Sequence, residues 1–260
     1  MEPFRISNSK LQSWETMCPI EFKAKYIDKT IEFVPTIEME WGNLFETLVI
    51  GGGIGGAFSF DKSPHGKKMI NSDYRARVEE QAELCKGYLK AFGGKVLSRQ
   101  EYIQSEVTDA SGTIIPIEGT LDIRYKLKDG RMAVIDLKFT GDTENDFGKF
   151  AWGSPEKMDL SQIKHYPLLT KLKYLLEYIP EGYYWVFDKG VDMKKKLIKC
   201  NISESAMHDH IERLSEAWNE ITMAIVMNDW TPKNTWENCS KCKAKCNFER
   251  VMPEIIEIDL

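Results

Sequence analysis

Three charged residues in the middle of the chain, Asp122, Asp136 and Lys138, have types and spacing suited to metal-assisted chemistry. They occupy polar positions in two consecutive stretches where apolar and polar residues alternate. Two carboxylates that face each other repel and need a cation, and a hard divalent ion such as Mg²⁺ or Mn²⁺ takes oxygen ligands from both. A lysine two residues later points to the same side and can orient or help deprotonate a metal-bound water. The alternative is an ordinary hairpin with a solvated polar face.

The register of this hairpin decides whether the two acids meet. Apolar residues occupy odd positions in both stretches of residues 115–141, so paired positions must sum to an even number. A three-residue loop at 128–130, with Gly130 in the left-handed region, satisfies this condition and gives pairs that sum to 258. The sequence therefore predicts Asp122 opposite Asp136, and Thr120 opposite Lys138.

The surrounding periodicities predict the elements that position these residues. Residues 8–28 read as two short helices broken at Cys18-Pro19, and residues 36–50 as a helix, followed by a loop to about residue 71. The later elements are expected to be a helix at 72–92, strands at 95–107, 114–127 and 131–140, a helix at 159–178, strands at 182–188 and 194–202, and a helix at 204–227. The order of the middle elements, αβββαβ, predicts an α/β fold with a mixed sheet flanked by helices.

A glycine-rich stretch, LVIGGGIGGAF, matches the pattern of a dinucleotide-binding loop. That motif needs a strand before the glycines and a helix beginning on them. Here the preceding segment has helical spacing, so we expect Gly51 to end a helix and the glycines to form a loop.

Composition sets limits on the class of protein. The chain has 260 residues, 42% of them apolar, and a formal net charge of −5, so any polyanion must be held by a local patch. No stretch reaches the roughly 18 consecutive apolar residues of a membrane span, and the N-terminus lacks a secretory pattern. We therefore expect a cytoplasmic protein with no membrane partner.

The six cysteines are unevenly spread. Cys239, Cys242 and Cys246 lie within eight residues, a spacing that inside a cell is more typical of metal binding than of disulfides. Cys85 and Cys200 fall on expected core positions of a helix and a strand.

These residues together resemble the PD-(D/E)XK nuclease superfamily, in particular its RecB-like and AddB-like iron–sulfur exonuclease branch. The similar motifs, spread over residues 18 to 246, are Gly119–Asp122 (G-x-x-D), Asp136–Lys138 (D-x-K), Gln162–Tyr166 (Q-x-x-x-Y), Gly42–Glu46 (G-x-x-x-E) and Cys18 with the three late cysteines. The resemblance implies a restriction-endonuclease-like core and metal-dependent hydrolysis of DNA.

By the same resemblance, the magnesium or manganese ligands would be Glu46, Asp122, Asp136 and the carbonyl of Leu137. Lys138 would position or activate water, and Gln162 and Tyr166 would contact DNA or brace the site. Glu46 lies opposite the apolar stripe of its helix, where a solvated glutamate is ordinary. Cys18 would complete a four-cysteine site, which suits a 4Fe–4S cluster or Zn²⁺.

The resemblance also implies how the chain is divided and what it binds. Residues 1–260 would form one nuclease domain: a helical part at 1–71, a catalytic core at 72–201, and a helix with a cysteine tail at 202–260 that packs back on the N-terminus. If the site is nucleolytic, Lys164, Lys171 and Lys173 would contact phosphates and Trp152 would stack on bases or belong to the core.

The expected function is a DNA exonuclease acting on ends or single strands in recombination, repair or replication, with protein partners in such a complex. The alternatives are a structure-dependent endonuclease and a DNA-binding subunit with a nuclease fold but no turnover. Retention of Asp122, Asp136 and Lys138 together argues against the last.

Overall fold

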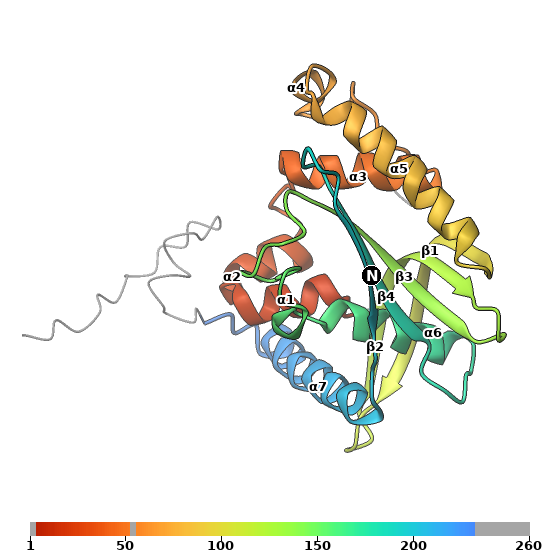
Figure 1. Ribbon diagram of the computed structural model, residues 1–260. Coiled ribbons are helices and arrows are strands. Elements are labelled where there is room, and N and C mark those ends of the chain that lie inside the picture. The colour runs from red at the N-terminus through yellow and green to blue at the C-terminus, as the bar shows by residue number, and fades with distance from the viewer. Residues whose placement is uncertain (1–3, 53–55, 232–260) are drawn as a thin grey trace, which may run out of the picture.

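The computed structural model describes residues 4–52 and 56–231. A five-stranded sheet in the order β1-β2-β3-β4-β5 runs through the molecule (Figure 1). Strands β3 and β4 are parallel and the other neighbours are antiparallel. The core elements are α5 (Tyr74–Ala91), β1 (Lys95–Thr108), β2 (Ile114–Lys126), β3 (Met132–Thr140), α6 (Ser161–Lys173), β4 (Glu181–Asp188) and β5 (Lys195–Cys200). This confirms the predicted αβββαβ order and the α/β fold class.

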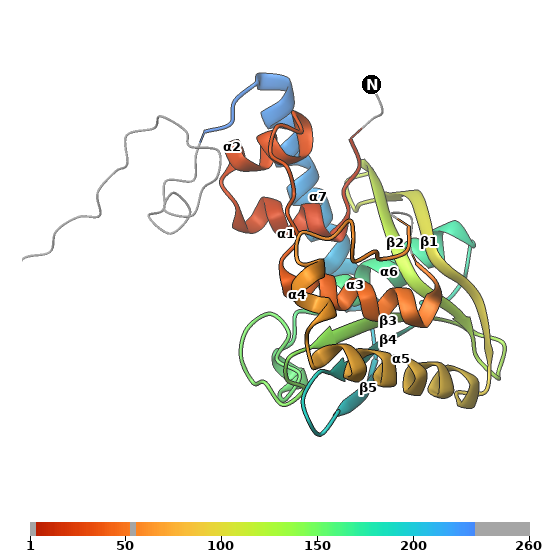
Figure 2. The ribbon, with the colours of Figure 1, turned by 90° about the horizontal axis from the view of Figure 1, so that it is seen from above.

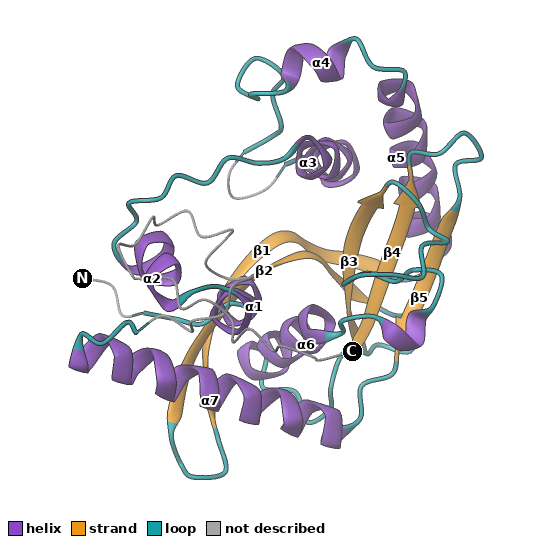
Figure 3. Cartoon of the chain, turned by 90° about the vertical axis from the view of Figure 1, so that its left-hand side faces the viewer, coloured by secondary structure: helices purple, strands orange, loops and turns teal. Residues whose placement is uncertain are grey.

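Helices cover both faces of the sheet (Figure 3). Helices α3 (Ile37–Ile50) and α5 lie on one face, and α1 (Asn8–Thr16), α6 and α7 (Glu204–Met227) lie on the other. Three of these helices begin at a hydroxyl cap, as α1 does where Ser7 Oγ accepts from the amide of Lys10. The remaining helical segments are α2 (Pro19–Phe22), a π turn at Lys23–Ile27, the short α4 (Gly66–Ile70) and a 3₁₀ turn at Pro155–Lys157.

The N-terminal helices pack against the last described helix (Figure 2). The indole nitrogen of Trp14 donates to Glu220 at 2.7 Å, and Arg213 of α7 forms a two-contact ion pair with Glu15. Segments about 200 positions apart in sequence are therefore joined directly. No helix in the described part of the chain has the length and apolarity that crossing a membrane requires.

Two segments differ from the expectation. The stretch after Gly51, predicted to be a loop, contains α4. Helix α6 ends at Lys173 instead of near residue 178, because Tyr174 closes the last turn and Leu175 adopts a left-handed φ of 51°. Gly51 itself ends α3 with a φ of 90°, as predicted.

The hairpin between β2 and β3 has the predicted register. The pairs run from Lys126↔Met132 to Ile123↔Ile135, and the position numbers in each pair sum to 258. Gly130 has a φ of 90°, and the amide of Leu127 donates to the carbonyl of Arg131 at 2.9 Å, which closes the three-residue loop. The ladder ends at Ile123↔Ile135, one position before the two aspartates would pair.

The sheet also changes direction at Asp122. On the neighbouring strand β1, Gln100 has a left-handed φ of 47°, and its neighbours Arg99 and Glu101 pair with Ile123 and Leu121, on either side of Asp122. Leu121 packs in the cluster with α6 and α7, whereas Ile123, two residues later, packs in the cluster with α3 and α5. Because residues two apart on a regular strand share one face, the strand must twist between them. Asp122 therefore lies at this twist, between the part of β2 that packs on α6 and α7 and the part that packs on α3 and α5.

Candidate active site

Asp136 is the centre of the polar cluster at the end of the β2–β3 ladder. Its carboxylate is fully buried, with an exposed fraction of 0%. Lys138 Nζ lies 2.5 Å from Asp136 Oδ2, and Gln162 Nε2 donates to Asp136 Oδ1 at 2.9 Å. Asp136 and Lys138 lie two positions apart on β3, so the alternation of the strand places them on the same side.

Asp122 reaches the same place from β2 by an unpredicted contact. The backbone amide of Leu137 donates to Asp122 Oδ2 at 2.7 Å. The carboxylate thus takes the amide that a continued ladder would have used, so the two strands separate here. The parity of the ladder was predicted correctly, but neither of the expected pairs Asp122–Asp136 and Thr120–Lys138 forms, because the ladder ends before them.

Helix α6 presents Gln162 and Tyr166 to Asp136. Gln162 Nε2 also lies 2.9 Å from the hydroxyl oxygen of Tyr166, so the predicted one-turn spacing brings both side chains to one face. Gly119 of β2 permits this approach, since a Cβ there would stand 2.8 Å from Leu169 Cδ1 and 3.2 Å from Tyr166 Cε1. The glycine of the G-x-x-D motif is therefore a packing requirement for α6.

Glu46 comes to the cluster from α3, on the other side of the sheet. It is half-buried, and its side chain forms a hydrogen bond with that of Asp122. Burial and the nearby Asp136 charge raise the pKa of Glu46. Placement opposite the apolar stripe does not leave Glu46 solvated, because α3 lies across the end of β3 with Phe45 stacked on Phe139 at 5.1 Å.

The cluster contains more negative charge than the buried surroundings favour. Burial, Asp136 and Glu46 raise the pKa of Asp122 well above its usual range, and burial raises the pKa of Asp136 despite the Lys138 ammonium. Burial disfavours the Lys138 cation, but Asp136 and Asp122 more than offset this and raise its pKa. Such a set of hard oxygen donors fits a divalent cation, which would relieve the repulsion.

The fit is incomplete in the described conformation. Among residues 4–52 and 56–231, no three acidic, histidine or cysteine side chains converge on one point as ligands. Asp136 is held by Lys138 and Gln162, and Asp122 by Leu137 and Glu46.

A second lysine beside the site was missed from the sequence. Burial lowers the pKa of Lys149, and the positive charge of Lys149 favours the ionised form of Asp136 and so lowers the pKa of that acid. Its ammonium donates to Gln12 of α1, so the N-terminal helix reaches the cluster through this contact. Lys149 belongs to no motif. The only sequence signal was a basic residue in the connection between the strand of Lys138 and the helix of Gln162.

A polar pocket of about 400 Å³ adjoins the cluster. Its lining includes Lys149, Gln162, Tyr166, Thr120 and Asn8. Asn8 is 7% exposed, and its Oδ1 has no hydrogen-bond partner in the described part of the chain. The pocket therefore offers polar groups immediately beside Asp136.

The four residues predicted to contact DNA do not line this polar pocket. Trp152 is only 2% exposed, and its ring centroid lies 5.1 Å from that of Phe150, on which it stacks. Of the two expected roles, Trp152 therefore has that of a core residue, and its ring cannot stack on a base in this conformation. The charge of Lys164 lowers the pKa of the buried His210 of α7, and Lys171 Nζ lies 3.8 Å from Oε1 of Glu204 of α7. Those two lysines extend toward α7, away from Asp136, because Gln162 and Tyr166 occupy the other face of α6. Lys173 is exposed at the end of that helix.

The predicted cysteine site is described only in part. Cys18 is 1% exposed and precedes the first turn of α2, with Pro19 at the first helical position. Cys239, Cys242 and Cys246 lie outside the described residues. Cys85 and Cys200 are buried, as expected of core residues.

Comparison with known proteins places the fold. No model of a known protein family matches the sequence, and no curated protein matches it. The structure is similar to the crystal structure of a protein from Eubacterium rectale named "putative exonuclease", with a TM-score of 0.58 and 13% identity over 97% of this chain and 91% of that one. A crystal structure named SSO0001 aligns with a TM-score of 0.43 and 13% identity over 95% and 87% of the two chains. The likeness to the first shows that this chain shares the α/β fold of that protein.

Proposed function

We propose that this protein is a metal-dependent deoxyribonuclease that hydrolyses phosphodiester bonds at DNA ends or in single strands, in recombination, repair or replication. The observation that carries this proposal is the convergence of Lys138 and Gln162 on the buried carboxylate of Asp136, with Asp122 beside it. Asp136 and Lys138 come from β3, Asp122 from β2 and Gln162 from α6, and a merely solvated hairpin face would not bring the helix residue to them. The name of the structural neighbour from Eubacterium rectale supports the same class of activity.

Each side chain then has a role that its position supports. Glu46, Asp122, Asp136 and the Leu137 carbonyl would hold a magnesium or manganese ion, which when bound polarises the phosphate and lowers the pKa of a bound water. Lys138, beside Asp136, orients the attacking water and stabilises the charge on the phosphate oxygens. Gln162 fixes the Asp136 carboxylate, and Tyr166 fixes Gln162.

The preference for strand ends has its own support. The 400 Å³ pocket beside Asp136 is bounded by α1, the β1–β2 hairpin and α6. A pocket closed by three elements suits the terminal nucleotide of a strand better than a continuous duplex. Lys149 in its wall supplies a positive charge for a phosphate.

The cysteines support a second metal site in the same protein. Pro19, next to Cys18, lines a pocket of about 670 Å³ together with Thr231, the last described residue. Cys239 follows Thr231 by eight positions, so it is within reach of Cys18. Cys18, Cys239, Cys242 and Cys246 would hold a 4Fe–4S cluster, or a zinc ion, that ties the C-terminal segment to the N-terminal helices.

Digestion of end-labelled DNA tests the proposed function. Linear single strands, linear duplexes and closed circles are incubated with the protein and Mg²⁺ or Mn²⁺, with Asp136→Asn as the control. The proposal expects loss of linear substrate, intact circles and no cleavage by the variant. Cleavage of closed circles would assign an endonuclease, and binding without cleavage under both metals would assign a non-catalytic subunit.

A further inference from the structure

The described surface contains one strongly basic groove that no motif identified. It has a volume of about 660 Å³ and lies between the end of α3, the end of α5 and the beginning of β1. Its cationic side chains are Lys86, Lys90, Lys95 and Arg99, and no acidic side chain lines it. Apolar residues such as Leu48 and Val96 form its floor. The lining suits an anionic chain with apolar parts.

Three of the four cations of this groove have no acidic partner among the described residues. Lys90, Lys95 and Arg99 are exposed, and none of them forms an ion pair with an acid in the described part of the chain. Lys86 pairs with Glu83, which lies outside the groove lining. Most other surface cations can be solvated singly, but here several share one concave site and repel one another.

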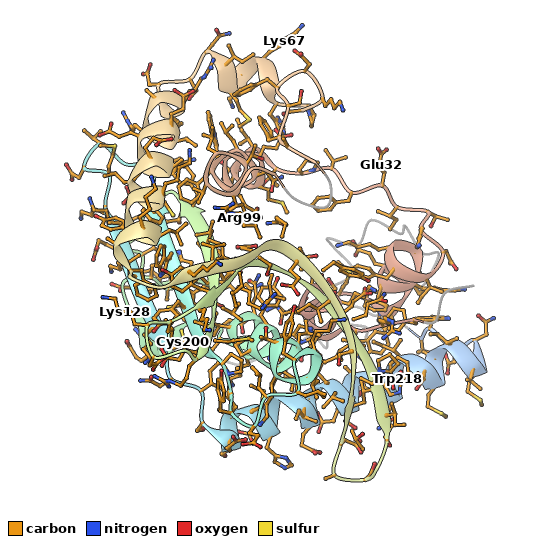
Figure 4. All side chains as sticks on the ribbon, turned by 90° about the vertical axis from the view of Figure 1, so that its right-hand side faces the viewer. Glu32, Lys67, Arg99, Lys128, Cys200 and Trp218 are labelled. Atoms are coloured by element: carbon orange, nitrogen blue, oxygen red, sulfur yellow. The ribbon has the colours of Figure 1, made fainter. Side chains whose placement is uncertain are left out.

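Two further lysines extend the same surface. Lys95 of β1 is directly paired with Lys126 of β2, and like charges opposite each other on a sheet are destabilising. Lys128, in the hairpin loop, covers Gly93 at the end of α5. Figure 4 shows Arg99 between α3 and the β1–β2 hairpin, and Lys128 beside the lower end of α5.

Part of this charge has an ordinary explanation. Lys90 lies in the last turn of α5 and Lys128 lies just beyond it, where cations favourably meet the negative end of the helix dipole. That effect reaches only the last turn of a helix, so it does not account for the facing pair Lys95–Lys126 or for Arg99. An external anion would stabilise all of these residues together.

The groove is built on elements that flank the candidate active site. Arg99 pairs with Ile123, the residue after Asp122. On the other wall, α3 contributes Leu48, two positions after Glu46 and about half a turn around the helix from it. The groove and the acidic cluster are therefore bounded by the same helix, α3, and the same hairpin, β1–β2.

We propose that this groove binds the sugar–phosphate backbone of a single DNA strand and directs it toward Asp122 and Asp136. This inference rests on the proposed nuclease function and names the surface that holds its substrate. Lys90, Lys95, Lys126 and Arg99 contact phosphates, and the apolar floor contacts sugars or bases. The strand then crosses the acidic cluster, and its end enters the polar pocket beside Lys149.

A charge-matched pair of variants tests this assignment. The groove variant is Lys90→Ala, Lys95→Ala, Arg99→Ala. The control is Lys62→Ala, Lys67→Ala, Lys68→Ala, which removes the same charge from exposed lysines at and near α4. This control site lies at the opposite end of α5, a helix about 27 Å long, and Figure 4 shows Lys67 there. Thermal unfolding of both variants checks that the fold is retained.

The measurement is fluorescence anisotropy with a 20-nucleotide single-stranded DNA, with calcium replacing magnesium and the oligonucleotide checked for integrity afterwards. We expect the groove variant to bind about tenfold or more weakly than wild type, and its slope of log affinity against log salt to fall by about two, since each single-strand phosphate contact contributes about 0.7. The control should stay within about twofold of wild type. Arg99→Lys, which keeps the charge, should retain most of the affinity of wild type.

The outcomes separate this inference from the proposed function. If wild type does not bind the oligonucleotide, the DNA-directed function fails, and the groove assignment fails with it. If wild type binds and the groove variant binds equally well, the groove assignment alone is wrong. Equal weakening by both triple variants would mean that affinity follows net charge, which also overturns the groove.

Discussion

Gln162 Nε2 donates a hydrogen bond to Asp136 Oδ1 at 2.9 Å. Gln162 lies on α6, the helix that connects the parallel strands β3 and β4, and Asp136 lies on β3. The same nitrogen lies 2.9 Å from the Tyr166 hydroxyl oxygen. The helix therefore fixes the orientation of the buried carboxylate, and it does so through an amide that carries no charge of its own. This contact distinguishes a constructed site from two acids that happen to share a hairpin.

Gln162→Ala should lower kcat for DNA cleavage by about ten- to a hundredfold, the equivalent of a hydrogen bond to a charged group. Tyr166→Phe removes only the hydroxyl next to Gln162 and should cost less than Gln162→Ala. Initial rates on a labelled single strand, at saturating and limiting substrate, measure both. If Tyr166→Phe were as damaging as Gln162→Ala, Tyr166 would contact the substrate itself.

Asp136→Asn should abolish cleavage while leaving the metal-free protein as stable as wild type or more stable. The replacement is isosteric, and it removes a buried acid whose pKa is raised by burial. Thermal unfolding without added divalent ions, together with the cleavage assay, provides the two measurements. A marked loss of stability would instead show that Asp136 is mainly a structural partner of Lys138.

The buried pair His165–His210 predicts an acid-sensitive fold. His165 Nε2 lies 3.0 Å from the Glu118 carbonyl oxygen, so it donates, and His165 Nδ1 then accepts from His210 Nε2 at 3.2 Å. Burial lowers the pKa of His165 to about 4, and burial, His165, Arg213 and Lys164 lower that of His210. Both histidines therefore bind protons more tightly in the unfolded chain, so stability falls as pH drops from about 6.5 toward 4.

His165 alone should account for about 3 kcal/mol of unfolding free energy across that window. The variant His165→Gln keeps a donor for the Glu118 carbonyl and cannot titrate, so its stability should fall less steeply than that of wild type. Urea unfolding at pH 4.5 and 6.5 measures the difference. His208→Gln replaces an exposed histidine of α7, the helix that carries His210; it is the matched control and should follow wild type.

The cysteine proposal predicts a colour. Anaerobically purified protein with a 4Fe–4S cluster should be brown and absorb near about 400 nm, whereas zinc would leave it colourless but detectable by elemental analysis. Cys18→Ser should lose most of the bound metal, and Cys85→Ala, in another part of the core, should retain it. Full metal content in Cys18→Ser would exclude Cys18 as a ligand.

Gly119→Ala should destabilise the protein by about 1–3 kcal/mol, because its Cβ would meet Leu169 and Tyr166 of α6. The matched control is Gly87→Ala in α5, where a Cβ meets nothing within 4 Å and alanine favours the helix by up to about 1 kcal/mol. Urea unfolding at neutral pH compares the two. Unchanged stability of Gly119→Ala would mean that α6 can shift away from β2.

The sequence determined the order of elements and the register of the central hairpin. Alternation and the position of Gly130 decide the parity of pairing, because a slip of one residue would turn every apolar side chain to the wrong face. The one-turn spacing of Gln162 and Tyr166 likewise determines that both share a helix face. These are local properties with periods of two and 3.6 residues, so a single sequence reveals them.

The tertiary structure decided which residues surround the site. Trp152 and the lysines of α6 have the residue types of DNA contacts, but packing buries the first and directs Lys164 and Lys171 toward α7. Neither Lys149 nor the residues of the basic groove belong to a motif. They come together only when α1, α3 and α5 pack onto the sheet. The twist at Asp122 depends in the same way on packing against both faces. Contacts between elements distant in sequence have no period to read, and the close packing of the core determines them.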